Sequence, residues 1–352
     1  STDNAAINND LLLKYMKPLV DVKQPKKLSL EEFILNSNKF PAPFPVANAK
    51  LATLLEAGYS SSTLEEYINS AYPIIHERLL PLLVSFLQTK AKHGKRKEKE
   101  LYKEAGILDL VDRLLKKRPI TFHGRPDFYM LQDGTEGCGG FDNIGHTCES
   151  SIICLSDYMS YDEIKLAALV GVSSKSHFIN NGDRHNDGNP GVPGEFQPSG
   201  VIVGLVGARF QKAGYMEWQD CIVSQEQNKA DLGYGAVTPE KYLMVRKWGQ
   251  LWGLTYLPTW EEVKDTPSTE YTEVYSQILL NNNVYKARIQ MSAEILLAEA
   301  CTRAKKASLK AYVHVVGLGL GVWRANIIQD ELFVEAFWNA IAVQKNISNL
   351  SH

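Results

Sequence analysis

The 352-residue sequence has little cysteine and no excess of charge of either sign. Its 5 cysteines are odd in number and lack C-x-x-C or Cys/His zinc spacing, so we expect reduced thiols and no structural metal. The formal net charge of −2 gives no general attraction for nucleic acid, which we exclude as a partner. Because no apolar run has the length of a membrane span and no signal region opens the chain, we expect neither a transmembrane segment nor a classical secretory signal.

The hydrophobic content of 44% is enough for one large or two ordinary domains. Residues 1–118 are predicted to be helical, with capping boxes at Ser29 to Glu32 and Thr63 to Glu66. Prolines in the KFPAPFP segment, residues 39–45, predict an extended connector within this part. From residue 119 onward short apolar runs alternate with helical patterns, so residues 119–352 are predicted to form an α/β domain.

A late stretch rich in glycine follows an apolar run without polar alternation. Tyr312 to Val316 predicts a strand covered on both faces. Gly317, Gly319 and Gly321 then alternate with apolar residues, which allows positive φ values and exposes backbone N–H groups to an anion such as phosphate. A tight turn whose glycines only permit close packing explains the same residues equally well.

An earlier loop, FINNGDRHNDG, gathers amide, carboxylate and guanidinium groups after a predicted strand. Such a group of side chains suits a sugar or nucleotide. The alternative is a set of Asx turns in which these side chains bind their own backbone, and it explains the loop equally well.

A second buried strand is predicted at 200–209, where Gly204 and Gly207 leave room for close approach. Beyond it, Glu217 and Asp220 flank Trp218, whose ring could raise the pKa of one of these carboxyl groups by desolvation. The alternative is an exposed helix face with ordinary surface charges.

Three motifs together, FINNGDRHNDG, VGARFQKAGYMEWQD and VHVVGLGLGVW, give residues 120–345 a resemblance to divergent macrodomains of the poly(ADP-ribose) glycohydrolase type. The resemblance extends to the atypical macrodomain of a Legionella effector that removes ADP-ribose from arginines of host mitochondrial ADP/ATP translocases. It implies a three-layer α/β/α fold around a mixed sheet, with the N-terminal helices as an accessory domain. ADP-ribose would lie across the strand ends.

The same resemblance implies roles for individual residues. Glu217 is the first candidate for the catalytic carboxylate and Asp183 the second, with Asp220 beside them, although the segment lacks the paired glutamates of the glycohydrolase signature. The residues expected to bind ADP-ribose are Asn180, Asn181, Arg184, Asn186, Gly207, Gln219, Gly317, Gly319, Leu320, Gly321, Val322 and Trp323.

The expected function is removal of mono-ADP-ribose from a protein side chain, with arginine as the acceptor and with no metal or redox cofactor. A non-catalytic ADP-ribose reader and an NAD-consuming ADP-ribosyltransferase remain as alternatives. A dehydrogenase is disfavoured because residues 317–323 lack G-x-G-x-x-G spacing and lie near the C-terminus. The resemblance implies an ADP-ribosylated protein partner, such as the translocase, and a secreted effector delivered into a host cell, at mitochondria; a cytoplasmic protein is the alternative.

Overall fold

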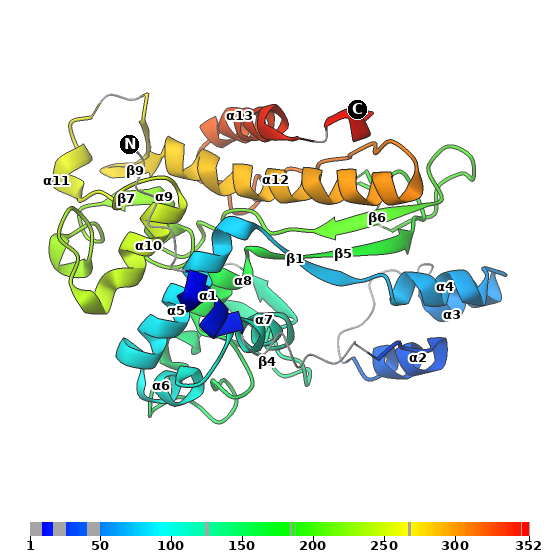
Figure 1. Ribbon diagram of the computed structural model, residues 1–352, viewed down its shortest axis with the longest axis horizontal. Coiled ribbons are helices and arrows are strands. Elements are labelled where there is room, and N and C mark those ends of the chain that lie inside the picture. Colours follow the sequence, from blue (N-terminus) through cyan, green and yellow to red (C-terminus); the bar gives the residue numbers. More distant parts are fainter. Residues whose placement is uncertain are drawn as a thin grey trace.

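The computed structural model describes residues 9–16, 26–40, 50–123, 127–183, 185–186, 188–266, 269–345 and 347–351. Over these residues the chain is a mixed α/β protein (Figure 1). None of the helices described is both long enough and apolar enough to cross a membrane. The predicted extended connector, residues 41–45 in particular, lies outside the described residues.

The region before residue 118 is mostly helical, as expected, but it also contributes a strand. Its helices are α1 (Asn9–Met16), α2 (Leu30–Asn38), α3 (Leu51–Glu56), α4 (Ser61–Ile68), α5 (Leu80–His93), α6 (Arg96–Tyr102) and α7 (Ile107–Lys116). β1 (Tyr72–Ile75) lies between α4 and α5, where β-branched Ile74 and Ile75 favour an extended backbone. A domain boundary near residue 118 stays a prediction; one buried cluster contains side chains from both sides of it, including Leu110 and Leu166.

The two N-terminal capping boxes have different outcomes. Ser29 accepts a hydrogen bond from the backbone N–H of Glu32, and the Glu32 side chain accepts one from the backbone of Ser29, so this box is confirmed. The second box was wrong, because α4 begins earlier and Ser60, whose hydroxyl accepts from the Thr63 N–H, is its N-cap.

Three small sheets of three strands each are present among the described residues. Their strand orders are β1-β5-β6, β2-β3-β4 and β7-β9-β8. The strands are β2 (Thr121–His123), β3 (Phe128–Met130), β4 (Glu136–Cys138), β5 (Val170–His177), β6 (Ser199–Gly204), β7 (Ile222–Ser224), β8 (Tyr271–Tyr275) and β9 (Ile278–Asn281). All pairings of these strands are antiparallel, so the structure confirms an α/β fold but not the expected three-layer fold around one mixed sheet.

The strand predicted at residues 312–316 was wrong. The segment pairs with no named strand, and only Ala311 forms an isolated bridge, to Leu350. Tyr312 is 73% exposed and Val316 is 59% exposed, so the apolar run is not covered on both faces. Composition favoured a buried strand, but a strand also needs a hydrogen-bonding neighbour, and none lies beside this segment in the described structure.

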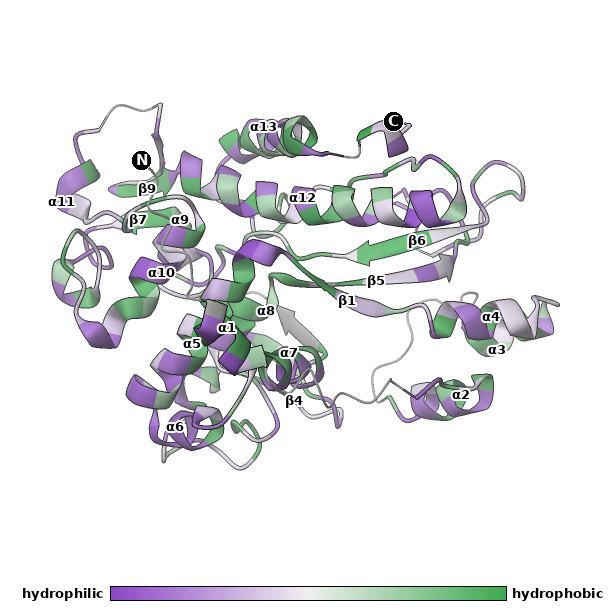
Figure 2. Ribbon diagram, in the orientation of Figure 1, coloured by the Kyte–Doolittle hydropathy of each residue, from purple (hydrophilic) through white to green (hydrophobic). Residues whose placement is uncertain are grey.

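Two long helices complete the fold. α12 (Asn282–Ala307) lies between α13 (Ile328–Val343) and the β1-β5-β6 sheet (Figure 1). Glu299 of α12 accepts hydrogen bonds from Tyr72 on β1 at 2.5 Å and from Ser173 on β5 at 2.6 Å, which fixes the helix against the sheet. Figure 2 shows β5 changing from hydrophobic at its start to hydrophilic at its far end. The buried stripe predicted for the last helix is confirmed, since Leu332, Phe333, Ala336 and Ala340 are buried and Phe337 packs against the core.

The remaining helices lie around one end of the β1-β5-β6 sheet (Figure 1). They are α8 (Tyr161–Ala167), α9 (Trp218–Cys221), α10 (Leu243–Leu251) and α11 (Trp260–Val263). Capping boxes at Ser160 to Glu163 and at Thr259 to Glu262 begin α8 and α11. Residues of α8, α9 and α10 line a cavity.

Candidate active site

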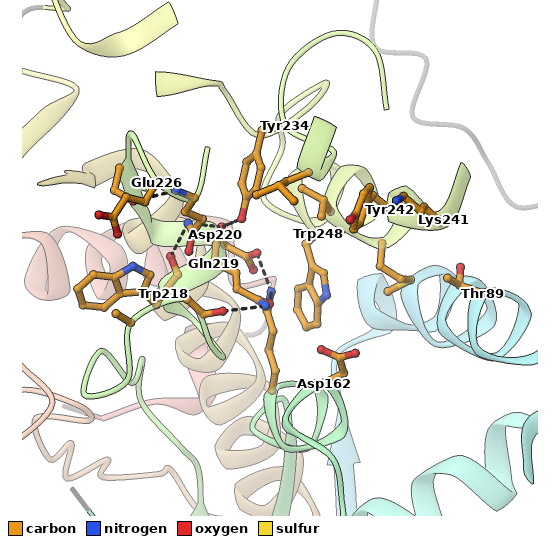
Figure 3. A pocket seen from close by; sticks show the side chains of 18 of the residues that line it. Thr89, Asp162, Trp218, Gln219, Asp220, Glu226, Tyr234, Lys241, Tyr242 and Trp248 are labelled. Carbon is orange, nitrogen blue, oxygen red and sulfur yellow. Dashed lines mark hydrogen bonds and ion pairs between the residues drawn. The ribbon is translucent and has the colours of Figure 1, made fainter. Parts of the chain in front are cut away.

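A cavity of ≈ 790 Å³ lies between α5, α8, α9 and α10 (Figure 3). This volume is typical of a pocket for a ligand of nucleotide size. Aromatic rings form much of its wall, and carboxylates, lysines and amides supply polar groups. Those that the argument uses are Asp162, Lys165, Gln219, Asp220, Tyr234 and Trp248.

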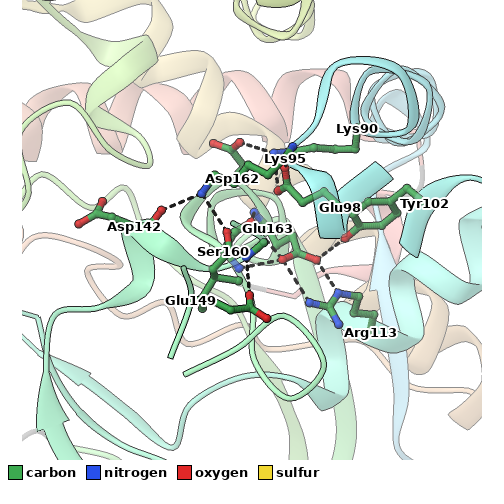
Figure 4. A network of polar contacts seen from close by, with 12 residues as sticks. Lys90, Lys95, Glu98, Tyr102, Arg113, Asp142, Glu149, Ser160, Asp162 and Glu163 are labelled. Atoms are coloured by element: carbon green, nitrogen blue, oxygen red, sulfur yellow. Dashed lines mark hydrogen bonds and ion pairs between the residues drawn. The ribbon is translucent and has the colours of Figure 1, made fainter. Parts of the chain in front are cut away.

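α8 is held rigidly, so Asp162 and Lys165 are presented to the cavity in fixed positions. The helix begins at a capping box in which Glu163 accepts from the backbone N–H and hydroxyl of Ser160. The buried Glu163 carboxylate also binds Arg113 of α7, with 2.5 Å between Oε1 and Nε (Figure 4). A buried ion pair that also has hydrogen-bond partners fixes geometry more firmly than an exposed one.

Asp220 lines this cavity and is paired with a buried lysine. Its Oδ1 lies 2.7 Å from Nζ of Lys165, and its Oδ2 accepts a hydrogen bond from the indole N–H of Trp252 at 2.9 Å. Burial raises the pKa of the Asp220 carboxyl, although the charge of Lys165 opposes this shift. The Lys165 ammonium also lies 4.1 Å from the centroid of the Trp248 ring, a cation–π contact that limits its movement.

Glu217 has a different environment and is not among the residues that line the cavity. It is 3% exposed and lies between two guanidinium groups, at 3.3 Å from Nε of Arg209 and 3.3 Å from Nη2 of Arg288. Burial opposes ionisation, but the charges of these arginines outweigh it and hold the pKa of Glu217 below its ordinary value. The two arginines thus favour the ionised form of Glu217, and its catalytic role stays a prediction.

The glycine loop packs directly on the segment that follows β6. A Cβ atom added to Gly207 would lie 2.4 Å from the backbone nitrogen of Gly319, so only glycine fits there. Gly319 itself has a φ of 81°, and an added Cβ would lie 2.9 Å from the carbonyl oxygen of Ala208. These two glycines therefore serve close backbone packing, as the alternative explanation of the loop proposed. Gly321 differs, because nothing lies within 4 Å of the position its Cβ would take.

Arg209 joins the glycine loop to α8 and α9. Its guanidinium carbon lies 6.0 Å from the centroid of the half-buried Trp323 ring, at the end of the loop. Its Nη2 donates to the carbonyl oxygen of Ile164 at 3.0 Å, and its backbone N–H donates to Glu217 at 3.2 Å. The loop and the cavity therefore lie on two sides of one connected group of residues.

The chain matches a known protein family. The family model described as ADP-ribosylhydrolase MavL-like matches residues 31–352. The chain belongs to the MavL-like ADP-ribosylhydrolase family.

Two curated relatives from Drosophila melanogaster are similar over most of the chain. ADP-ribosylarginine hydrolase CG3568 is 38% identical over 323 residues, which are 90% of this chain and 63% of the relative. ADP-ribosylarginine hydrolase CG2909 is 36% identical over 319 residues, which are 88% of this chain and 62% of the relative. The chain thus spans less than two thirds of the length of each of these relatives.

The structure does not bring the Asn-rich loop to this site. The β5–β6 pairing runs from His177 opposite Ser199 to Val172 opposite Gly204, and the loop connects the His177 and Ser199 ends. Gly207 lies beyond the opposite end, and β6 alone separates the two ends by about 17 Å at about 3.3 Å per residue. The expectation that this loop and the glycine loop share one pocket is therefore corrected.

Within the loop, side chains bind the loop's own backbone. Asn180 accepts from the N–H of Gly182 at 2.9 Å, and Asn181 accepts from the N–H of Asp183 at 3.1 Å and from the Asn186 amide at 2.7 Å. These contacts are the Asx turns of the alternative explanation. The Asp183 carboxylate accepts in turn from the backbone N–H of His185 at 2.8 Å. Arg184 lies outside the described residues.

The remaining predicted residues lie either at the cavity or in the glycine loop. Gln219 lines the cavity together with Asp220, and its Oε1 accepts from Lys165 at 3.2 Å. Leu320 packs against the core, whereas Val322 is 92% exposed. A Cβ atom added to Gly317 would lie 3.2 Å from the Leu320 side chain.

Sequence reasoning missed Asp162 and Lys165 as site residues. The only signal they carry is their i, i+3 spacing on a short capped helix, which places both on one helix face. Nothing local shows that α9, which lies 55 residues beyond Lys165, meets that face.

Proposed function

We propose that this protein is an ADP-ribosyl hydrolase that removes mono-ADP-ribose from arginine side chains of a modified protein. The observation that carries the proposal is the family match over residues 31–352. The names of the two relatives support arginine as the acceptor. A cavity of ≈ 790 Å³ with aromatic walls and a buried carboxylate supports a nucleotide-sugar substrate.

The proposed reaction breaks the bond between the anomeric carbon of the ribose and a guanidino nitrogen. The electron pair of that bond leaves with the nitrogen, and the oxygen of a water molecule forms the new bond to carbon. One water proton passes to a protein base and from there to the departing guanidine. No electrons are exchanged with an outside acceptor, so the proposal requires no redox cofactor.

Among the three carboxylates suggested by the sequence, Asp220 is the proposed base. It lines the cavity, and Lys165 and Trp252 hold both of its oxygens in place. Its raised pKa brings proton acceptance and return closer to neutral pH. Glu217 is proposed as a positioning residue, since it holds the backbone of Arg209 beneath the glycine loop.

The ADP-ribose is proposed to extend from the cavity toward the glycine loop. Ala213 and Gly214 line the cavity, while Gly207 in the same segment contacts the loop. Backbone N–H groups around Gly321 would face the diphosphate, because the space beside that residue is open.

Three finer proposals rest on the sequence resemblance alone. They are a relationship to macrodomains of the glycohydrolase type, an acceptor protein such as the mitochondrial ADP/ATP translocase, and delivery into a host cell by secretion. An experimental structure with bound ADP-ribose tests the first, and assay of the modified translocase tests the second. Localisation of the tagged protein tests the third against a cytoplasmic location.

Incubation with arginine-, serine- and glutamate-linked ADP-ribosylated substrates tests the proposed function. Free ADP-ribose, followed by chromatography, is expected from the arginine-linked substrate. Binding without release would identify a reader. Consumption of NAD with modification of a protein would identify a transferase. Either result would overturn the hydrolase proposal.

A further inference from the structure

A partly buried lysine, Lys212, in a cage of tyrosines and aspartates lies beside the cavity. The ammonium of Lys212 lies 4.1 Å from the ring centroid of Tyr161 and 4.4 Å from that of Tyr215. Its Nζ donates to Oδ2 of Asp127 at 2.7 Å and lies 3.6 Å from Oδ2 of Asp142. Aromatic faces combined with carboxylates are the usual surroundings of a bound organic cation. We call these residues, other than Lys212, the cation cage.

The ammonium leaves part of the cage unused. Asp127 is 2% exposed, and its Oδ1 is buried without a hydrogen-bond partner among the described residues. Asp127 also has a φ of 48°, in the left-handed region. The hydroxyl of Tyr161 donates to Oδ2 of Asp127, as Lys212 does, so the unfilled acceptor of the cage is Oδ1 of Asp127.

A guanidinium would satisfy this acceptor better than an ammonium does. Its planar fork of N–H groups can bind both oxygens of one carboxylate, whereas Lys212 contacts only Oδ2 of Asp127. Lys212 is 21% exposed, and its four-carbon chain can leave the cage without movement of the backbone. Asp142, 48% exposed, provides the second carboxylate at the open side.

The cage and the cavity are neighbours. The ammonium of Lys95, which lines the cavity, donates to the carbonyl oxygen of Asp142 at 2.7 Å (Figure 4). Tyr161 is followed in the chain by Asp162, and Lys212 is followed by Ala213. Asp162 and Ala213 both line the cavity. On α8, Tyr161 of the cage and the lysine that binds Asp220 are four residues apart, so they lie on one helix face.

We infer that the cation cage is the subsite for the acceptor guanidinium of the substrate, and that Lys212 fills it when no substrate is bound. This inference rests on the proposed hydrolysis of arginine-linked ADP-ribose and adds the group that selects the linkage. The substrate guanidinium displaces the lysine, and its N–H groups reach Asp142 and the unused oxygen of Asp127.

Two substitutions test the inference in the full chain. Asp142→Asn removes one charge at an exposed position, and we expect the KM for an ADP-ribosylarginine peptide to rise about tenfold, the effect of roughly 1.4 kcal/mol. The Kd of ADP-ribose, measured by calorimetry, should stay within about twofold because the cage does not bind the nucleotide. Unchanged KM in Asp142→Asn would overturn the inference.

Lys212→Met removes the internal cation and keeps an unbranched side chain that is one atom shorter. We expect agmatine, a free guanidinium probe, to bind this variant about tenfold more tightly than the parent protein. Lys286→Met, which removes an ammonium paired with Glu335 on the surface of α12 and α13, is the matched control. It should change neither the affinity for agmatine nor the KM for the ADP-ribosylarginine peptide. Unchanged or weaker agmatine binding by folded Lys212→Met would overturn the inference.

The failure of the reaction assignment has a separate signature. A parent protein that releases no ADP-ribose from the arginine-linked peptide, while Lys212→Met binds agmatine more tightly, would refute the hydrolase proposal and still support a guanidinium site. If Lys212→Met does not fold, Asp142→Asn alone decides, because its exposed position tolerates the change.

Discussion

Lys165 Nζ lies 2.7 Å from Oδ1 of Asp220, and both side chains are almost completely buried at the wall of the cavity. The pair brings α8 and α9 together from distant parts of the sequence. Because a buried carboxylate is costly without a partner, Lys165 keeps Asp220 in one orientation while burial raises its pKa. This relationship is the basis of the proposed chemistry.

Replacing Asp220 with Asn should slow release of ADP-ribose by at least about a hundredfold, since a positioned base is lost while the shape is kept. The Kd of ADP-ribose should change by less than about threefold. Single-turnover kinetics and calorimetry measure the two effects. Full activity in folded Asp220→Asn would exclude this carboxylate as the base.

Glu217→Gln should act chiefly on stability. The amide leaves Arg209 and Arg288 without their shared anion, and breaking a buried pair in this way costs about 3 kcal/mol of the free energy of unfolding. Denaturant unfolding measures the change. Glu335→Gln, which removes an exposed partner of Lys286, is the control and should cost less than about 1 kcal/mol. Equal effects of the two variants would contradict this account of Glu217.

Gly319→Ala should destabilise the glycine loop by about 1–2 kcal/mol, because a residue with a side chain is strained at positive φ. The φ of Gly319 is 81°, and the added Cβ would also lie 2.9 Å from the carbonyl oxygen of Ala208. Thermal unfolding measures the loss. Gly321→Ala has open space and should leave the melting temperature unchanged. A stable Gly319→Ala protein would show that the loop relaxes freely.

Gly321→Val tests whether the loop binds the diphosphate. The branched side chain enters open space next to the backbone N–H groups, so ADP-ribose affinity should fall about tenfold without loss of stability. Calorimetry on the folded variant gives the Kd. Parent-like affinity would leave the loop with a packing role only.

Acid should weaken the fold through Glu294. Burial opposes ionisation of this carboxyl, but hydrogen bonds from His76 and Gln290 and the charge of Arg78 outweigh it and lower its pKa from 4.5 to about 2. A lowered pKa means that the unfolded chain binds the proton more readily, so the contribution is complete above about pH 4.5 and is lost as the pH falls toward 2. Glu294→Gln should remove up to about 2 kcal/mol of the pH dependence between these values. Identical acid unfolding curves for the parent protein and Glu294→Gln would refute a contribution of Glu294 to the pH dependence of stability.

Local signals predicted the helices well. The capping box at Ser29 lies within a few residues of the helix that it begins, α2. The strand expected at 312–316 failed because composition says nothing about whether a neighbouring strand is in place.

The site was predictable only in part. Asp220 was found because an aromatic residue lies between two carboxylates in a short segment, and Gln219 was found through the family resemblance. The difference between Asp220 and Glu217 depends on Lys165 and Arg288, which come from α8 and α12. Such long-range partners decide which carboxylate is a fixed anion and which faces a cavity, and the local sequence does not contain them.

The pairing of β1 with β5 has a practical consequence for shortened versions of the protein. A version that begins after residue 75 would expose the N–H and C=O groups of β5 from Val170 to Ser173, where β1 now pairs. Free edges of this kind pair with the same edge on another molecule, which leads to aggregation. Any fragment made for crystallisation should therefore retain residues 72–75, even where the preceding helices are removed.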